Sequence, residues 1–158
     1  MLDPTGQLAL RLGAALLLGS ILGLNRELHG KPAGLRTHAL VCLGAALATL
    51  LGLGPPSHWA TADPNAISRV IQGILTGVGF LGAGVILRDP MGHVTGLTTA
   101  ATIWICAVMG IVCGLGQWGL LGIGAVLTVL LLLFGRPIER LAERIFKKHI
   151  DTPPDHSV

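Results

Sequence analysis

The chain has 158 residues, of which 51% are hydrophobic and only 12% are charged, and its mean hydropathy is +0.71. A soluble domain usually carries about 25% charged residues, so this composition argues against one and predicts a membrane protein. The formal net charge of +3 does not indicate nucleic-acid binding, because the basic residues stand at the ends of apolar segments, where membrane topology puts them.

Five apolar segments are each close to the length of about 20 residues that a membrane-spanning helix needs. We expect these helices at about residues 7–24, 37–53, 67–87, 97–115 and 118–134. Each must be helical, because unpaired backbone polar groups are costly in lipid. The predicted fold class is therefore all-α, a polytopic membrane helix bundle with five transmembrane helices.

The basic residues are divided unevenly between the two sets of connections. Nine lie on one side, namely Arg26, Lys31, Arg36, Arg88, Arg136, Arg140, Arg144, Lys147 and Lys148. Only Arg11 and Arg69 lie near the other side, one turn inside the first and third segments. The positive-inside rule then predicts an outer N-terminus and an inner C-terminus. Arg11 and Arg69 either extend to the outer interface or form a vestibule that attracts anions.

The stretch 25–38 is a dense polar cluster between two apolar segments. Its candidate residues for binding an anion or a partner are Arg26, Glu27, Lys31, Arg36 and His38. The next helix begins within this stretch, and helix N-termini attract anions. The alternative is that these residues only cap the helix and set its orientation.

An internal repeat at an offset of 62 residues aligns this stretch with residues 87–100, which adds Arg88 and Asp89 to the candidate site. The first and second segments would then match the third and fourth as a parallel repeat, related by an axis along the membrane normal. The fifth segment would be an addition. Chance similarity is the alternative, because the chain is rich in Gly, Leu and Ala.

The third segment is rich in glycine. Its Gly73-x-x-x-Gly77 spacing is typical of helix association, and an alternative is that exposed backbone lines a substrate path. The candidate residues for packing or for a pathway, with two from the start of the fourth segment, are Gln72, Gly73, Thr76, Gly77, Gly79, Gly82, Gly84, Thr98 and Thr99.

The remaining residues give little indication of enzymatic chemistry. No Asp or Glu lies deep in a segment, so the oxygen cage that a dehydrated divalent cation needs is missing from the sequence. The three cysteines lie in apolar segments without a C-x-x-C pair, and we interpret them as packing residues. We expect no catalytic residues, no metal site and no cofactor.

Residues 1–134 are predicted to form the transmembrane domain, and the sequence changes character at Gly135. Apolar and basic residues alternate at helical spacing across 135–150, which predicts a short amphipathic helix on the anionic inner leaflet. Residues 151–158 are predicted to be a flexible tail.

Three motifs then resemble those of the MgtC/SapB family of bacterial inner-membrane proteins. They are Gly-Leu-Asn-Arg-Glu at 23–27 with Gly-Lys-Pro-Ala-Gly-Leu-Arg-Thr-His at 30–38, the glycine-rich run at 77–86, and Gly-Leu-Thr-Thr-Ala-Ala at 96–101. The chain departs from the family pattern at Asn25, where an acidic residue is frequent. Many members also continue into a soluble cytoplasmic domain.

The resemblance implies a role in adaptation to low magnesium, and one family member is associated with restraint of the F-type ATP synthase. We therefore predict a non-enzymatic multi-pass protein of the bacterial inner membrane that acts through helix contacts with a membrane partner, such as that synthase. An alternative is a small ion transporter or channel formed by a homo-oligomer, with a dimer favoured. A third hypothesis is the sensing of lipid or anions at the inner face.

Overall fold

The computed structural model describes residues 3–88 and 93–150, with the backbone alone at 87–88, 136, 141–144 and 146–150. Its long helices are α1 (Pro4–Leu28), α2 (Leu35–Leu53), α3 (Pro64–Val85), α4 (Leu97–Leu115) and α5 (Trp118–Ile150). A short 3-10 helix, η1 (Pro56–Thr61), precedes α3. Two-residue strands β1 (Leu87–Arg88) and β2 (Val94–Thr95) pair in antiparallel register before α4.

All five long helices are long and apolar enough to cross a membrane, so the predicted all-α membrane bundle is confirmed. The start and end of α4 are those expected from the sequence. Both α1 and α3 begin three residues earlier than expected, because an aspartate caps each one and a proline occupies its first turn. Asp3 accepts a hydrogen bond from the Gly6 amide (3.0 Å), and Asp63 accepts one from the Asn65 amide (2.9 Å).

The fifth helix differs from its prediction. We expected a spanning helix that ends near Phe134 and a separate amphipathic helix from Gly135, but α5 continues through Pro137 to Ile150. Proline removes one intrahelical hydrogen bond without forcing a helix to end. The residues around it, such as Leu133, Glu139 and Arg140, favour the helix on both sides.

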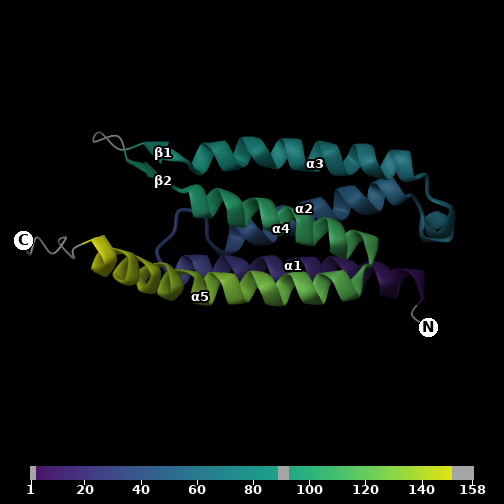
Figure 1. Cartoon of the computed structure of the whole chain (residues 1–158). Coiled ribbons are helices and arrows are strands. Elements are labelled where there is room, and N and C mark those ends of the chain that lie inside the picture. The colour runs from purple at the N-terminus through teal and green to yellow at the C-terminus, as the bar shows by residue number, and fades with distance from the viewer. Residues whose placement is uncertain (1–2, 89–92, 151–158) are drawn as a thin grey trace, which may run out of the picture. The chain divides into compact units, whose positions relative to one another are not determined.

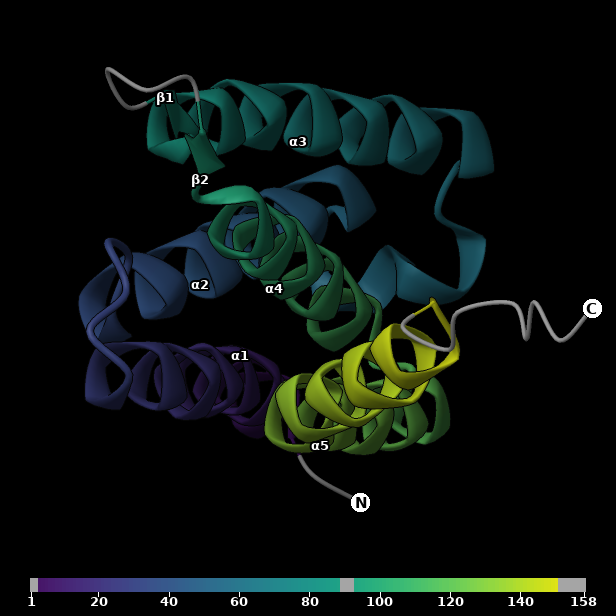
Figure 2. The same ribbon diagram turned by 60° about the vertical axis from the view of Figure 1, so that its left-hand side comes forward.

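The described residues divide into two compact units, one that ends at Gly122 and another that begins at Ile123. In the first unit α2 and α4 lie side by side, with α1 on one side of them and α3 on the other (Figures 1 and 2). Exchanging α1 with α3 and α2 with α4 leaves this set of neighbours unchanged, as a parallel repeat would. The repeat and the orientation in the membrane stay predictions.

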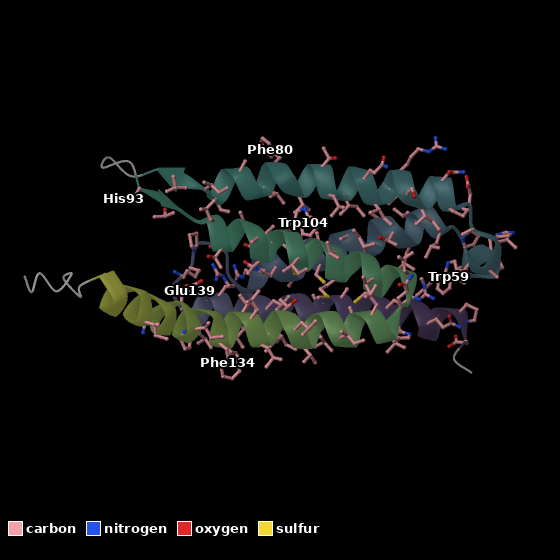
Figure 3. The ribbon with its side chains drawn as sticks, viewed as in Figure 1. Trp59, Phe80, His93, Trp104, Phe134 and Glu139 are labelled. Atoms are coloured by element: carbon pink, nitrogen blue, oxygen red, sulfur yellow. The ribbon has the colours of Figure 1, made fainter. Side chains whose placement is uncertain are left out.

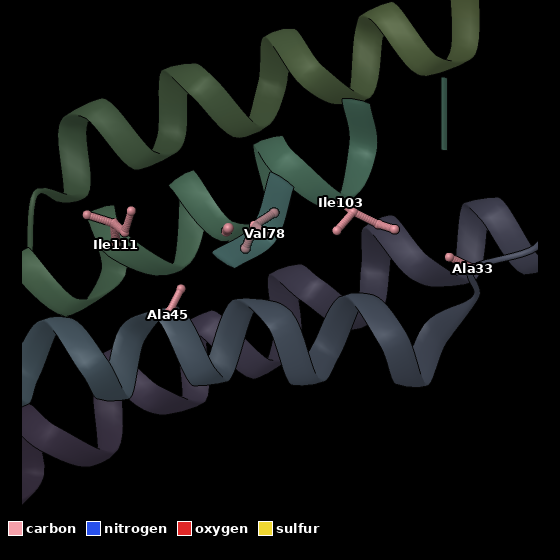
Figure 4. Close-up of a cluster of buried hydrophobic side chains, with 6 residues drawn as sticks. Ala33, Ala45, Val78, Ile103 and Ile111 are labelled. Atoms are coloured by element: carbon pink, nitrogen blue, oxygen red, sulfur yellow. The ribbon is translucent and has the colours of Figure 1, made fainter. Parts of the chain in front are cut away.

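Glycine allows the central helices to approach closely. A Cβ at Gly19 would lie 2.6 Å from the His38 carbonyl oxygen, and one at Gly114 would lie 2.7 Å from Thr49 Cβ. Beside these contacts is a small core of buried apolar side chains, which is formed by Ala33, Ala45, Val78, Ile103, Ala107 and Ile111 (Figure 4).

Candidate functional site

The predicted polar cluster lies at one end of the first unit, which we call the loop end because residues 29–34 connect α1 to α2 there. Glu27 Oε2 accepts a hydrogen bond from the Leu35 amide (2.9 Å), so a carboxylate of α1 caps the first turn of α2. A Cβ at Gly34 would lie 2.8 Å from that same Oε2 atom. A side chain at position 34 would therefore displace this carboxylate, and Gly30 supplies the turn with φ +62°.

Arg26 is buried at the loop end and has only 5% of its surface exposed. Its Nη2 donates a hydrogen bond to Thr99 Oγ1 (2.6 Å), which ties the last turn of α1 to the first turn of α4. A buried guanidinium is tolerated only when polar groups surround it. The hydrogen bond to Thr99 supplies one such group, and it joins a residue of the first predicted repeat to a residue of the second.

His38 is fully buried next to this contact. Its Nδ1 lies 3.0 Å from the Gly34 carbonyl oxygen, which can only accept, so Nδ1 carries the proton. Its Nε2 lies 3.3 Å from Thr102 Oγ1, whose hydroxyl is also 2.9 Å from the Thr99 carbonyl oxygen. The Cys106 thiol donates to the His38 carbonyl oxygen (3.1 Å). His38 is thus a structural link between α2 and α4.

Lys31 and Arg36 lie on the outside of the loop, and Arg36 is exposed. They line a cavity of about 490 Å³ together with Glu27, Gly34 and Thr37. The structure therefore divides the predicted cluster in two. Arg26 and His38 face the protein interior, and the two other cations border an open, polar cavity.

The second copy of the cluster is described only in part. The side chain of Arg88 and all of Asp89 lie outside the described residues. Thr98 is exposed, whereas Thr99 is buried against Arg26. Gly96, just before α4, has φ +89°, and a Cβ there would overlap the Val85 carbonyl group, so only glycine fits this turn.

The glycines of α3 are mostly open. A Cβ at Gly73, Gly77, Gly79 or Gly84 would meet no atom within 4 Å, and only at Gly82 would it touch a neighbour, Ala100 Cβ at 3.6 Å. The predicted packing role within the chain therefore holds for Gly82 alone among these five glycines.

Two glycines of α3 border a groove. Gly73 and Gly77 line an apolar depression of about 400 Å³ between α2 and α3, and α2 contributes Leu40, Gly44 and Ala45 to it. We call this depression the α2–α3 groove. Small residues line both of its sides.

The glycines that do pack lie elsewhere. Gly19 and Gly23 of α1 contact α2, and Gly110 and Gly114 of α4 also contact α2. Both pairs have the same G-x-x-x-G spacing as Gly73 and Gly77 of the third segment. The signal was therefore present in the sequence, but nothing in it distinguished buried pairs from open ones.

Arg11 has a specific place at the opposite end of the unit. Its Nη1 donates to the Gly114 carbonyl oxygen (2.6 Å), and its guanidinium lies 3.8 Å from the centre of the Trp59 ring. A cation is favoured beside the carbonyl end of a helix and over an indole face. Arg11 thus links α1 to the end of α4 and to η1. Whether it also extends to the outer interface or contributes to a vestibule stays a prediction. Arg69 is exposed, and its Nε donates to the Asn65 carbonyl oxygen (3.4 Å).

Comparison with known proteins settles the family. A model of the MgtC family matches residues 12–141. The chain belongs to the MgtC family. It is 43% identical to protein SrpB of Synechococcus elongatus over an alignment of 162 positions, which covers 94% of this chain and 89% of SrpB. No solved structure matches it.

Two longer family members match over part of their length. Protein MgtC of Salmonella typhimurium is 47% identical over 109 residues, which cover 69% of this chain and 44% of MgtC. The Escherichia coli protein named "Putative magnesium transporter YhiD" is 38% identical over 135 residues, which cover 81% of this chain and 60% of YhiD. The chain thus spans less than half of MgtC. Its family and its spanning helices make it a multi-pass membrane protein.

Proposed function

We propose that this chain is a non-enzymatic regulator in the bacterial inner membrane that supports adaptation to low magnesium and acts on membrane energetics. It would do so by receiving a transmembrane helix of a partner protein in the α2–α3 groove. The family resemblance suggests the F-type ATP synthase as that partner. The observation that carries the proposal is the groove itself, which is lined by glycines whose missing side chains leave space for another helix.

The physical basis is the close approach of backbones. Two helices in lipid gain little from the hydrophobic effect and associate through packing at small residues. Gly44 of α2 and Gly73 and Gly77 of α3 have no atom within 4 Å of where a Cβ would stand. A partner helix could therefore approach both walls of the groove at once.

The proposal is tested by filling the groove. Gly77→Leu should abolish the growth advantage that the protein gives in low magnesium and should remove cross-links from the groove to ATP synthase subunits. Gly13→Leu is the matched control, because Gly13 of α1 is equally open but lies away from the groove. If Gly77→Leu protein, present at wild-type levels in the membrane, supports growth and cross-linking as wild type does, the proposal is wrong.

The loop end would make a second contact. Lys31 and Arg36 border its cavity and present two cations to an anionic headgroup or to an acidic segment of the partner. Arg26 and His38 would act on this contact only through the position of the loop, because both are buried. Replacing Lys31 and Arg36 with glutamine should weaken binding to vesicles that contain anionic lipid, with little change in folding.

A small ion transporter formed by a homo-oligomer is the second candidate. Gln72 and Thr76 favour it, because both are exposed polar residues on a helix that is apolar enough to span a membrane. Magnesium flux into liposomes that contain the purified protein would support this candidate if Gln72→Leu reduced the flux. An absence of magnesium flux into these liposomes would count against the transporter and favour the regulator.

A further inference from the structure

One strip of the exposed surface of α3 lacks large apolar side chains, unlike the exposed surfaces of α1 and α2. On α1 and α2 the large exposed side chains include Leu17, Ile21, Leu47 and Leu51, which suit contact with lipid. The corresponding face of α3 carries a line of polar and small residues, all exposed: Asn65, Arg69, Gln72, Thr76, Gly79 and Ala83. We call this line the α3 seam.

The seam is continuous along α3, and all of its residues are exposed. Its residues are spaced alternately by four and three positions, the heptad repeat of a helix that packs along another helix. The buried residues of α3, Val78 and Gly82, lie about a third of a turn around the helix from the centre of the seam. Phe80 borders the seam, has 82% of its surface exposed, and points away from the bundle (Figure 3).

The seam extends to depths where lipid offers no hydrogen bonds. At 1.5 Å per residue, Gln72 lies about 12 Å along α3 from Pro64, and Thr76 lies about 18 Å along it. The Thr76 hydroxyl donates to the Gln72 carbonyl oxygen (2.8 Å) and is satisfied locally. The Gln72 carboxamide has no hydrogen-bond partner among the described residues. An amide without hydrogen bonds is unfavourable in hydrocarbon, so a polar group from outside this unit must form hydrogen bonds with it.

From these observations we infer that the α3 seam is a self-association surface, on which α3 of a second copy of this chain packs in parallel about a twofold axis along the membrane normal. In that arrangement each residue faces its own copy at the same depth. Two Gln72 carboxamides can pair, because each one both donates and accepts. Gly79 and Ala83 allow the two backbones to approach further along the seam.

The composition of the seam favours a second copy over a different protein. Its only charge is Arg69, and Arg69 bends toward the Asn65 carbonyl near the start of α3, where headgroups and water can solvate two such cations. Apart from that residue the seam consists of groups that are complementary to themselves. The seam also lies outside the α2–α3 groove, so this inference does not depend on the partner proposed above.

The first test is disulfide cross-linking of single cysteines in the full-length chain, in native membrane vesicles. Cysteine at Gln72 or Thr76 should give a cross-linked dimer under mild oxidation. The matched control is Leu81→Cys, which is exposed on the same helix but lines the groove and should stay monomeric. The wild-type chain gives the background, because its three cysteines are buried.

The second test measures dimer dissociation in liposomes by single-molecule photobleaching. Gln72→Leu should raise the dissociation constant about three- to thirtyfold, the weight of one interhelical hydrogen bond in lipid. Leu51→Ala, at an exposed apolar position of α2, should leave it unchanged. The inference is wrong if cysteine at Leu81 cross-links as well as cysteine in the seam, or if the seam cysteines cross-link only to other proteins. It is also wrong if Gln72→Leu leaves the dissociation constant of the dimer unchanged. Loss of the growth phenotype in Gly77→Leu protein that still dimerises would support the groove proposal separately.

Discussion

Gly110→Ala should destabilise the chain, although alanine favours helices. The added Cβ would overlap the Cys42 carbonyl oxygen and would lie 2.9 Å from Ala45 Cβ. These atoms belong to the backbone and to the shortest side chain of α2, so none of them can rotate away. The helices α2 and α4 must therefore move apart along a contact that Gly114 continues one turn later.

The magnitude follows from comparison with Gly44→Ala. Gly44 is also within a long helix, but its Cβ would meet no atom within 4 Å. Replacing glycine with alanine in a helix gains about 0.5–1 kcal/mol at either site. That gain is the same for both variants and cancels when their free energies of unfolding are compared. The remaining difference is the cost of forcing an extra methyl group into the close contact at Gly110, about 1–3 kcal/mol. Gly110→Ala should be the less stable variant by that amount.

The free energy of unfolding can be measured for both variants in the same micelles, by titration with a denaturing detergent followed by circular dichroism. We expect Gly44→Ala to be at least as stable as wild type and Gly110→Ala to be less stable. Equal stabilities of the two variants would refute the reasoning, because they would mean that α2 and α4 do not approach closely at Gly110.

Three further substitutions test single contacts. Glu27→Ala should cost about 0.5–2 kcal/mol, the weight of a helix cap, and should speed amide exchange in the first turn of α2, whereas Glu27→Gln keeps an acceptor and should change both less. Thr99→Val removes the 2.6 Å acceptor of Arg26 and should lower the free energy of unfolding by about 1.5–3 kcal/mol; a stability equal to wild type would mean that this bond is dispensable. Arg11→Leu should destabilise the end of α4 by about 1–3 kcal/mol, and unchanged tryptophan fluorescence would contradict its stacking on the indole.

The polar cluster at the loop end is divided between the interior of the protein and its surface. Arg26 and His38 connect α1, α2 and α4 through buried hydrogen bonds. Lys31 and Arg36 remain beside an open cavity.

Much of the fold could be predicted from the sequence, because lipid restricts the choices. Five apolar segments of spanning length must be helices, and their positions follow from where the apolar residues stop. The boundary furthest from its prediction is the end of α5, where a glycine and a proline suggested a break. Both residues weaken a helix locally, and a strong helical sequence on each side outweighs them.

Which polar groups are buried was decided only by the tertiary structure. Arg26 and Arg36 look alike in the sequence, but one faces α4 and the other faces solvent. The same holds for glycine, since Gly110 packs closely while Gly73 is open. Spacing along one helix places residues on a common face, but it carries no information about which neighbour covers that face. That neighbour is chosen by the packing of all the helices together, because every close contact of one helix limits where the others can lie.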